Sequence, residues 1–539
     1  DNFMVRPHRR HRDKYVKQLE QVYNEPTELS LRGRMDKFWN SWQELSNYPE
    51  QVAARNAVVE SGQSLADGVR LRYQQLNQVR TVLNEEIGVQ VAKINDLTTS
   101  IASLNTEIVK VKAEGDNPND LLDKRDKLVN DLSGIINITV DNRDPDEFSI
   151  HTNGYHVVQG GIARRFELAN DPANEGYNKV IWPDIKEDAH FSSGSLAAMV
   201  ELRDRDLRQE IQGLDNFAVN FIDLVNSTHR ESYGINGQTG NDFFVEHAFV
   251  NNAQGNFDRN GDGTVDHSYI YRLTGGNKLD PQQQVGLRGQ ITLPGPKGDI
   301  KVDYYPTDTV EDVVLRINHS GAEVVARLDR NMRLDLKGTP GSGLDQPDFV
   351  IRKVEDSGQF LTGYAGLLRT SGADGAFNWN KPDAITALRA ENTGYAVAPV
   401  VHPSGWIAVN EEIRRDPMSI AASLGSQRKP GDIGDGRAAL EIADLRQKAV
   451  MVGTSASFDD YFADRVAAVG VKGQEAQIAT RTQELIMKNL RDARESYSGV
   501  NMDEDLAQMI KFQHGYNAAA KFVTVIDEML DTVINRLGV

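Results

Sequence analysis

The stretch YQQLNQVRTVLNEEIGVQVAKINDLTTSIASLNTEIVKV, residues 73–111, decides the fold of this chain. Its apolar side chains alternate in steps of three and four residues, the heptad pattern typical of a coiled coil. They are Tyr73, Leu76, Leu83, Ile87, Ile94, Leu97, Ile101, Leu104, Ile108 and Val111, with Arg80 and Gln90 in two further seam positions. Because no proline occurs between Pro49 and Pro118, the pattern predicts one very long helix.

A seam of two positions per heptad cannot bury itself, so this helix needs partner helices. The sequence predicts three, over residues 117–135, 195–226 and 502–537. A short EGD turn before the first should fold it back antiparallel. Their seam positions are Leu121, Arg125, Leu128, Leu132 and Ile135; Leu207, Ile211, Leu214, Ala218, Phe221 and Val225; and Met502, Leu506, Met509, Tyr516, Ala520, Val523, Leu530, Ile534 and Leu537. Residues 30–45 form another amphipathic helix, with Ser30 as its cap.

The middle of the chain has a different pattern. Residues 136–158 predict short strands with TNGY as a hairpin turn, and residues 245–368 alternate β-branched segments with Gly, Pro and Asn clusters. The expected fold is therefore α+β and multidomain: a helical coiled-coil bundle from both chain ends with inserted β-rich domains. We expect a helical core from 1–135, 192–241 and 436–539, a small β-hairpin element at 136–191, an inserted β-rich domain at 242–377 and a mixed return segment at 378–435.

Composition excludes several classes of protein. Asp and Glu number 78 against 60 Lys and Arg, a net charge of −18, so the surface repels nucleic acid and anionic lipid. The one basic run, RPHRRHRDK at 6–14, is assigned no function. No cysteine occurs, which excludes disulfides and thiolate sites. Neither a cleavable signal nor an apolar run of about 18 residues is found, so we expect no membrane span and export by another route.

Five segments resemble a known family. They are NDLLDKRDKLVNDLS from Asn119, SGSLAAMVELRD from Ser193, NGQTGNDFF from Asn236, FDDYFADRVAAVGV from Phe458 and SGVNMDEDLAQMIKFQHGYNAAAKFVTVIDEMLDTVIN from Ser498. The last is similar to a C-terminal helix shared by several flagellar axial proteins. Together with the first two, it resembles the family of hook-associated protein 1 (FlgK), the hook-filament junction protein of bacterial flagella.

The resemblance implies a structural subunit and no enzyme. Family members join hook to filament in a ring beneath the second hook-filament junction protein, and they bind the hook protein and an export chaperone. They are exported unfolded through the flagellar secretion channel and work outside the cytoplasm, on the cell exterior or in the periplasm of bacteria with enclosed flagella. Neither nucleic acid nor membrane is expected as a partner.

The beginning of the chain departs from the family pattern. Members usually begin with a long helix and a segment similar to ANT-x-GYSRQ, and nothing similar precedes Tyr15. The seam at 502–537 then lacks its partner within the chain. We expect that segment to be mobile in the isolated monomer, because an exposed apolar seam does not offset its ordering entropy.

The sequence contains no catalytic constellation. GxxxxGK[ST], HExxH and GxSxG are absent, and the 11 histidines do not group at ligand spacings. Arg80 and Arg125 are interpreted as residues that set helix register or form interfaces rather than as catalytic groups. The sequence therefore gives no reason to expect an enzyme.

One stretch, DRNGDGTVD at 258–266, has the spacing of a calcium loop. Ca²⁺ prefers six to eight oxygen ligands, which such a loop supplies as it bends around the ion. The candidate metal ligands are Asp258, Asn260, Asp262, Thr264 through its carbonyl, and Asp266. Tyr269 stands where the full pattern has a bidentate Glu, so the affinity should suffer. The alternative is a polar Asp/Asn/Gly turn without metal.

The possible cofactor is thus structural calcium, acting as a staple rather than as a sensor. The rival function is a calcium-dependent surface adhesin or binding module, which the loop and the acidic surface permit. Loss of a junction protein leaves bare hooks that shed flagellin, whereas loss of an adhesin leaves filaments intact.

Overall fold

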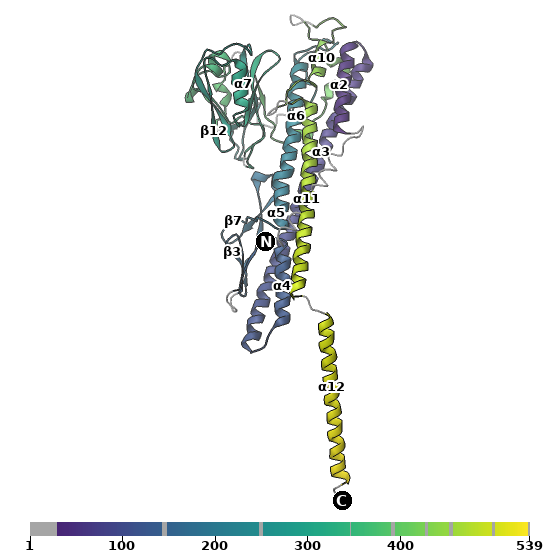
Figure 1. Ribbon diagram of the computed structural model, residues 1–539. Helices are drawn as coiled ribbons and strands as arrows, with labels where there is room; N and C mark the ends of the chain where they lie inside the picture. Colours follow the sequence, from purple (N-terminus) through teal and green to yellow (C-terminus); the bar gives the residue numbers. More distant parts are fainter. Residues whose placement is uncertain are drawn as a thin grey trace.

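An elongated helical shaft forms the centre of the molecule, with a β-rich outer domain on one side of its upper end and a single helix below it (Figure 1). The computed structural model describes residues 30–142, 148–246, 252–344, 346–389, 394–425, 430–451, 456–498 and 502–536. The start of the chain, with the basic run at 6–14, lies outside the described residues. The expected α+β fold, with helices towards both ends and sheets in the middle, is confirmed.

The shaft is built from the predicted helical segments except 502–537, which projects below it instead of packing against the long helix. Its members are α2 (Leu31–Asn47), α3 (Val52–Ala113), α4 (Asn119–Ser133), α5 (Ser195–Glu201), α6 (Leu207–Arg230), α10 (Arg437–Asp444) and α11 (Phe458–Ser498). A π-helical turn, Leu202–Asp206, joins α5 to α6. Ser30 caps α2 as predicted, since its hydroxyl accepts a 3.0 Å hydrogen bond from the Gly33 amide.

The buried face of α3 departs from the predicted seam in its second half. Leu76, Leu83 and Ile87 are buried as expected, but Thr98 and Asn105 are buried where Leu97 and Leu104 were predicted. An α-helix has 3.6 residues per turn, so a straight helix drifts by about 20° per heptad from a strict seven-residue pattern. Over 62 residues this drift moves the buried stripe by one position.

Aromatic side chains join the upper end of the shaft. Phe221 on α6 is fully buried, with its ring centroid 5.2 Å from Phe38 of α2 and 5.2 Å from Phe458 of α11. Trp39, Trp42, Phe217, Phe243 and Phe244 complete this aromatic cluster. Segments more than two hundred residues apart in sequence thus share one core.

Two small sheets lie against the middle of the shaft. The first has the order β1-β2-β3-β4 and the second β5-β6-β7. Their strands are β1 (Thr139–Asp141), β2 (Ser149–Thr152), β3 (Tyr155–Gln159), β4 (Ile162–Ala163), β5 (Glu167–Asn170), β6 (Asn178–Trp182) and β7 (Glu187–Asp188). The predicted TNGY turn joins β2 to β3, with Asn153 and Gly154 at the positive φ that such a turn requires.

The outer domain contains two four-stranded sheets, ordered β13-β14-β10-β17 and β12-β11-β15-β16. The strands are β10 (Ile270–Lys278), β11 (Gly289–Gly295), β12 (Gly298–Tyr304), β13 (Val324–Leu328), β14 (Arg333–Gly338), β15 (Lys353–Asp356), β16 (Phe377–Asn378) and β17 (Gly394–Val397), preceded by the two-stranded pair β8 (Asn256–Phe257) and β9 (His267–Ser268). Helix α7 (Val310–Asn318) begins at a capping box made by Thr309 and Asp312.

This domain extends beyond the predicted boundary at 377. Strand β17, from the predicted return segment, pairs with β10 through Ile270 and Val397. β17 is the outermost strand of this sheet and hydrogen-bonds to the free side of β10. The local sequence pattern did not predict this pairing. The return segment then forms α8 (Pro403–Trp406) and α9 (Glu411–Arg415) on the shaft. None of the described helices is long and apolar enough to span a membrane.

Candidate assembly surface and metal site

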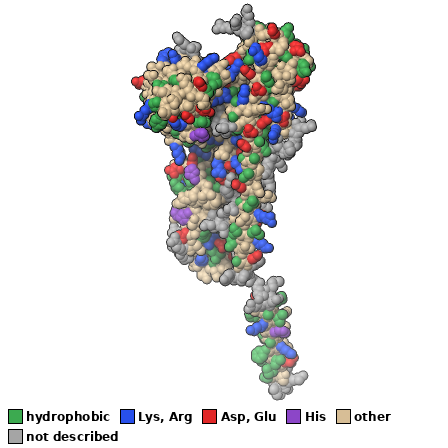
Figure 2. All heavy atoms as spheres, turned by 45° about the horizontal axis from the view of Figure 1, so that its top comes forward, with side chains coloured by type: hydrophobic (Ala, Val, Ile, Leu, Met, Phe, Trp, Pro, Cys, Tyr) green, Lys and Arg blue, Asp and Glu red, His purple; other side chains and the backbone are tan. Residues whose placement is uncertain are grey.

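Helix α12 (Met502–Asp531) projects below the shaft, away from the body of the molecule (Figures 1 and 2). All described side chains from 505 to 534 are exposed. Among them are large apolar groups, including Phe512 at 74% exposure and Tyr516 at 76%. Of the predicted seam, Leu506, Met509, Tyr516, Val523, Leu530 and Ile534 belong to this exposed set. A contiguous exposed apolar surface marks an association site.

The preceding helix, α11, is by contrast firmly attached to the shaft. Phe458, Phe462 and Val469 are buried in the shaft core. Glu210 on α6, only 4% exposed, accepts ion pairs from Arg465 at 2.7 Å and from Lys472 at 3.1 Å. The chain therefore passes from a fixed helix to one with no apolar packing partner among the described residues.

The 258–266 loop lies between β8 and β9 of the outer domain. The Asp258 carboxylate accepts hydrogen bonds from the Gly261 and Gly263 amides, both at 2.8 Å. Asp262 accepts from the Thr264 amide at 2.8 Å, and the Thr264 hydroxyl lowers the pKa of its carboxyl group. Asp266 accepts from His267 Nδ1 at 2.5 Å. These bonds fold the loop sharply around its own carboxylates.

Each predicted calcium ligand is therefore placed in one compact loop. Asp258 and Asp266 are half-buried, whereas Asn260, Asp262 and Thr264 are exposed. Across the described ranges, no group of three or more His, Asp or Glu side chains is arranged to hold a metal ion. Tyr269, at the position of the missing Glu, is buried at 5% exposure against Phe257, with 4.6 Å between ring centroids.

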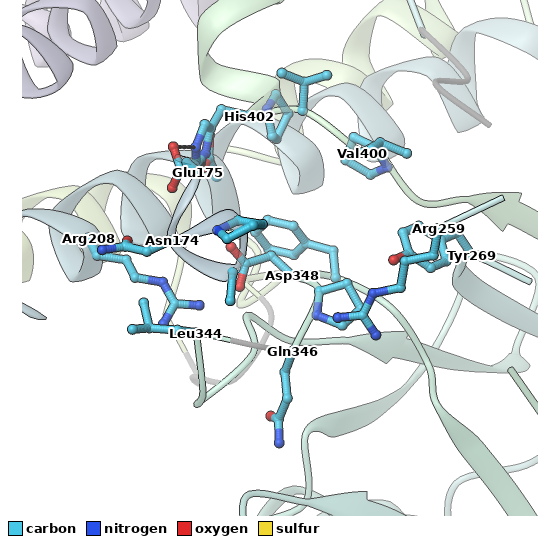
Figure 3. A pocket seen from close by; sticks show the side chains of 18 residues that line it. Asn174, Glu175, Arg208, Arg259, Tyr269, Leu344, Gln346, Asp348, Val400 and His402 are labelled. Carbon is cyan, nitrogen blue, oxygen red and sulfur yellow. Dashed lines mark hydrogen bonds and ion pairs between the residues drawn. The ribbon is translucent and has the colours of Figure 1, made fainter. Parts of the chain in front are cut away.

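A cavity of about 250 Å³, lined by polar and apolar side chains alike, lies where the 170–176 turn, α6 and the outer domain meet (Figure 3). His402 bridges two carboxylates there, with Nδ1 2.6 Å from Asp215 and Nε2 3.2 Å from Glu175. Burial opposes the charged imidazole, but Asp215 and Glu175 together raise the pKa of His402 to about 10. Arg80 of α3 pairs with Glu175 at 2.8 Å. These groups neutralise one another, as in a structural clamp.

A second buried cluster attaches the outer domain to the shaft. Asp223 on α6 pairs with Arg272 at 2.6 Å and with Lys337 at 2.7 Å. Burial alone would raise the pKa of Asp223, but the two cations hold it well below its usual range. The Tyr271 hydroxyl donates to Asn220 at 3.0 Å. Sequence analysis missed both clusters, because their members are far apart in the chain.

Comparisons with known proteins agree with this architecture. A family model described as the flagellar hook-associated protein FlgK helical domain matches residues 16–244. Another, the flagellar basal body rod FlgEFG protein C-terminal model, matches residues 494–537, which include α12. Flagellar hook-associated protein 1 of Salmonella typhimurium is 27% identical over 518 residues, covering 94% of this chain and 81% of the relative. The chain carries the FlgK helical domain over residues 16–244, and over almost its whole length it is similar to flagellar hook-associated protein 1.

Further proteins named flagellar hook-associated protein 1 align over a similar extent. The Escherichia coli K12 protein is 25% identical over 517 residues, with coverage of 94% and 81%. The Bacillus subtilis protein is 24% identical over 558 residues, with coverage of 98% and 80%. The solved structure of the flagellar hook junction protein FlgK from Burkholderia pseudomallei has the same fold, with a TM-score of 0.54 and 15% identity over 91% of this chain and 98% of that chain.

Similarity to flagellar hook-associated protein 1 over almost the whole chain implies a structural role at the hook-filament junction of the bacterial flagellum. The family is not enzymatic, and its members belong to the extracellular flagellum. The resemblance predicted from the five sequence segments is thereby confirmed.

Proposed function

We propose that this chain joins hook to filament as a subunit of a ring, and that α12 is the helix through which it associates. The observation that carries the proposal is the exposure of every described side chain from 505 to 534, among them large apolar groups. Removing such side chains from water stabilises a complex by about 1.5–3 kcal/mol for each fully buried residue. Coiled-coil pairing with another axial helix would bury them.

The same exposure supports the proposed partners. We propose the hook protein and the second hook-filament junction protein as neighbours in the assembled flagellum. An export chaperone would cover the apolar surface before assembly. Secretion in an unfolded state through the flagellar channel is compatible with the absence of cysteine, because folding outside the cell then requires no disulfide exchange. Whether the flagellum is external or periplasmic depends on the host.

The proposal can be tested with Tyr516→Glu combined with Val523→Glu, which charges α12 at two exposed positions. The variant replaces the bacterium's own copy, and incorporation into isolated hooks is measured along with flagellin shed into the medium. We expect loss of incorporation, bare hooks and shed flagellin. Ile162→Glu is the matched control, since Ile162 is equally exposed at 74% but lies on β4.

Two outcomes would contradict the proposal. Normal incorporation of the α12 variant would show that this helix is not the assembly element. Intact filaments together with lost surface adhesion, in cells that lack the protein, would favour an adhesin instead.

We also propose that the 258–266 loop binds Ca²⁺ as a staple of the outer domain. The curled backbone supports this, because the bonds from Gly261 and Gly263 to Asp258 give the sharp bend that a calcium loop needs. Since Tyr269 replaces the bidentate Glu, the expected dissociation constant is about 10⁻⁴–10⁻³ M, the range of weak extracellular modules.

Calorimetric Ca²⁺ titration and thermal melting would test the staple. We expect saturable heat and a calcium-dependent rise in the melting temperature, both lost in Asp262→Ala and both retained in Asp123→Ala, an exposed α4 acid outside the loop. If Asp262→Ala still releases or absorbs heat on Ca²⁺ addition, or if the unmodified chain shows no heat of binding, the loop is a polar turn that does not bind Ca²⁺.

A further inference from the structure

Helix α11 carries an apolar stripe on its outer face. Val471, Ile478 and Leu485 are exposed at 54%, 58% and 58%, and they follow one another at seven-residue steps. Val469 and Ala476, on the other face, are buried in the shaft. The stripe therefore points away from the core, and nothing in the described part of the chain covers it.

Helix α3 carries a similar stripe on its own outer face. Val82 and Val89 are also seven residues apart, with exposures of 36% and 66%. Leu83 and Ile87 lie on the opposite, buried face of the helix. Because both stripes point away from the same core, α3 and α11 of one chain cannot bring them together.

The two stripes have complementary charges. On α3, the exposed Glu85 lies three residues after Val82, and on α11 the exposed Arg481 lies three residues after Ile478. The two helices run in the same direction, since each begins at the upper end of the shaft and ends at its lower end (Figure 1). Side-by-side copies in the same orientation would therefore present these stripes in parallel.

One parallel register matches both apolar and charged positions. If Val82 of one copy is level with Ile478 of the next, Val89 is level with Leu485 and Glu85 with Arg481. Farther along, the exposed Lys93 and Asp96 come within one helical turn of Asp492 and Lys488. Glu85, Lys93 and Asp96 then each have an opposite charge on α11 within about one helical turn, while Asp96 is also level with the like-charged Asp492.

We propose that the outer face of α3 docks in this register against α11 of a second copy of the chain. The inference rests on the proposed ring and adds a surface on the shaft, distinct from α12. Because different faces of the two copies meet, the contact is heterologous, and its repetition generates rings or helical assemblies.

Cysteine pairs test the register directly, because the chain has no cysteine of its own. The Val89→Cys, Leu485→Cys chain is produced in bacteria that lack their own copy, and isolated flagella are oxidised before non-reducing electrophoresis. We expect a ladder of covalent multimers. The control pair Ile162→Cys, Leu485→Cys, with Ile162 on β4, should give none.

Charge reversal supplies a second, independent measurement. Glu85→Arg alone and Arg481→Glu alone should each reduce the multimer ladder of the cysteine-pair chain, and the double reversal should restore it. All four positions are exposed, so the melting temperature of each variant should match that of the unmodified chain.

Incorporation into flagella without a ladder, or single reversals that leave the ladder unchanged, would overturn the α3–α11 contact while leaving the junction role intact. Failure of the unmodified chain to enter flagella would instead contradict the proposed function itself.

Discussion

Lys337 of β14 donates to Asp223 of α6 at 2.7 Å, and both side chains are almost completely buried. The bond crosses from the outer domain to the shaft over 114 residues of sequence. Burial and the nearby Arg327 lower the pKa of Lys337 to about 8. The outer domain thus meets the shaft through buried charged groups contributed by both sides.

Asp223→Ala should destabilise the attachment of the outer domain to the shaft. The change leaves Lys337 and Arg272 buried without their shared carboxylate, which costs about 3–5 kcal/mol. Thermal unfolding should show a lowered transition, and protection from hydrogen exchange should fall in β10 and β14. The control is Asp299→Ala, which removes the surface pair with Lys353 and should cost less than about 1 kcal/mol. Equal effects of the two variants would contradict the assignment.

Stability above neutral pH should depend on His402. Its folded pKa of about 10 exceeds the ordinary 6.5, so its contribution is fully present below pH 6.5 and is lost as pH rises through 10. The groups facing it are Asp215, Glu175, Arg80 through Glu175, and the Tyr73 ring at 5.2 Å. Denaturant unfolding of His402→Gln should show a smaller loss of stability between pH 6.5 and 10.

The comparison must be with the unmodified chain at each pH, because Lys337 acts in the opposite direction. Its folded pKa of about 8 lies below the ordinary 10.5, so deprotonation increases stability between those values. If the free energy of unfolding changes with pH in the same way in His402→Gln and in the unmodified chain, His402 does not stabilise the fold through Asp215 and Glu175.

Gly194→Ala should strongly destabilise the shaft. Gly194 has φ of +96° before α5, and an added Cβ would lie 2.3 Å from the carbonyl oxygen of Ile135. Both the backbone conformation and the contact with rigid backbone exclude a side chain. Gly470→Ala is the control, because its Cβ would meet nothing within 4 Å and the change should stabilise α11 by about 0.5–1 kcal/mol. Similar melting temperatures for the two variants would contradict this reasoning.

Helix α12 should exchange its amide hydrogens faster than α3 in the isolated chain. Most helical stability in proteins comes from packing of an apolar face, and α12 has no such packing among the described residues. Hydrogen exchange measured by mass spectrometry distinguishes the two helices. Exchange in α12 as slow as in α3 would contradict the expectation of a mobile terminal segment.

Local sequence patterns predicted the helices and strands better than they predicted which of these elements pack or pair with one another. The heptads of residues 73–111 and the absence of proline predicted α3, since helix formation depends on nearby residues. The burial of Thr98 and Asn105 was not predictable, because it follows from the accumulated drift of a straight helix. Strand β17 was missed because its pairing with β10 is set by tertiary contacts.

The same distinction applies to the candidate sites. The sequence indicated the exposed seam of α12 and the turn geometry at 258–266, both local properties. It gave no sign of the Asp223–Lys337 pair, because two charged residues in separate helix and strand patterns look like ordinary surface residues until the fold buries them.

The unbroken length of α3 has a mechanical consequence. At 62 residues it extends about 93 Å, so it acts as a lever whose lower end lies far from the aromatic cluster at its upper end. A sideways force at the tip produces torque about that cluster. The load of a turning flagellum would then be carried by close-packed rings such as Phe38 and Phe221, which resist compression from any direction, rather than by directional hydrogen bonds.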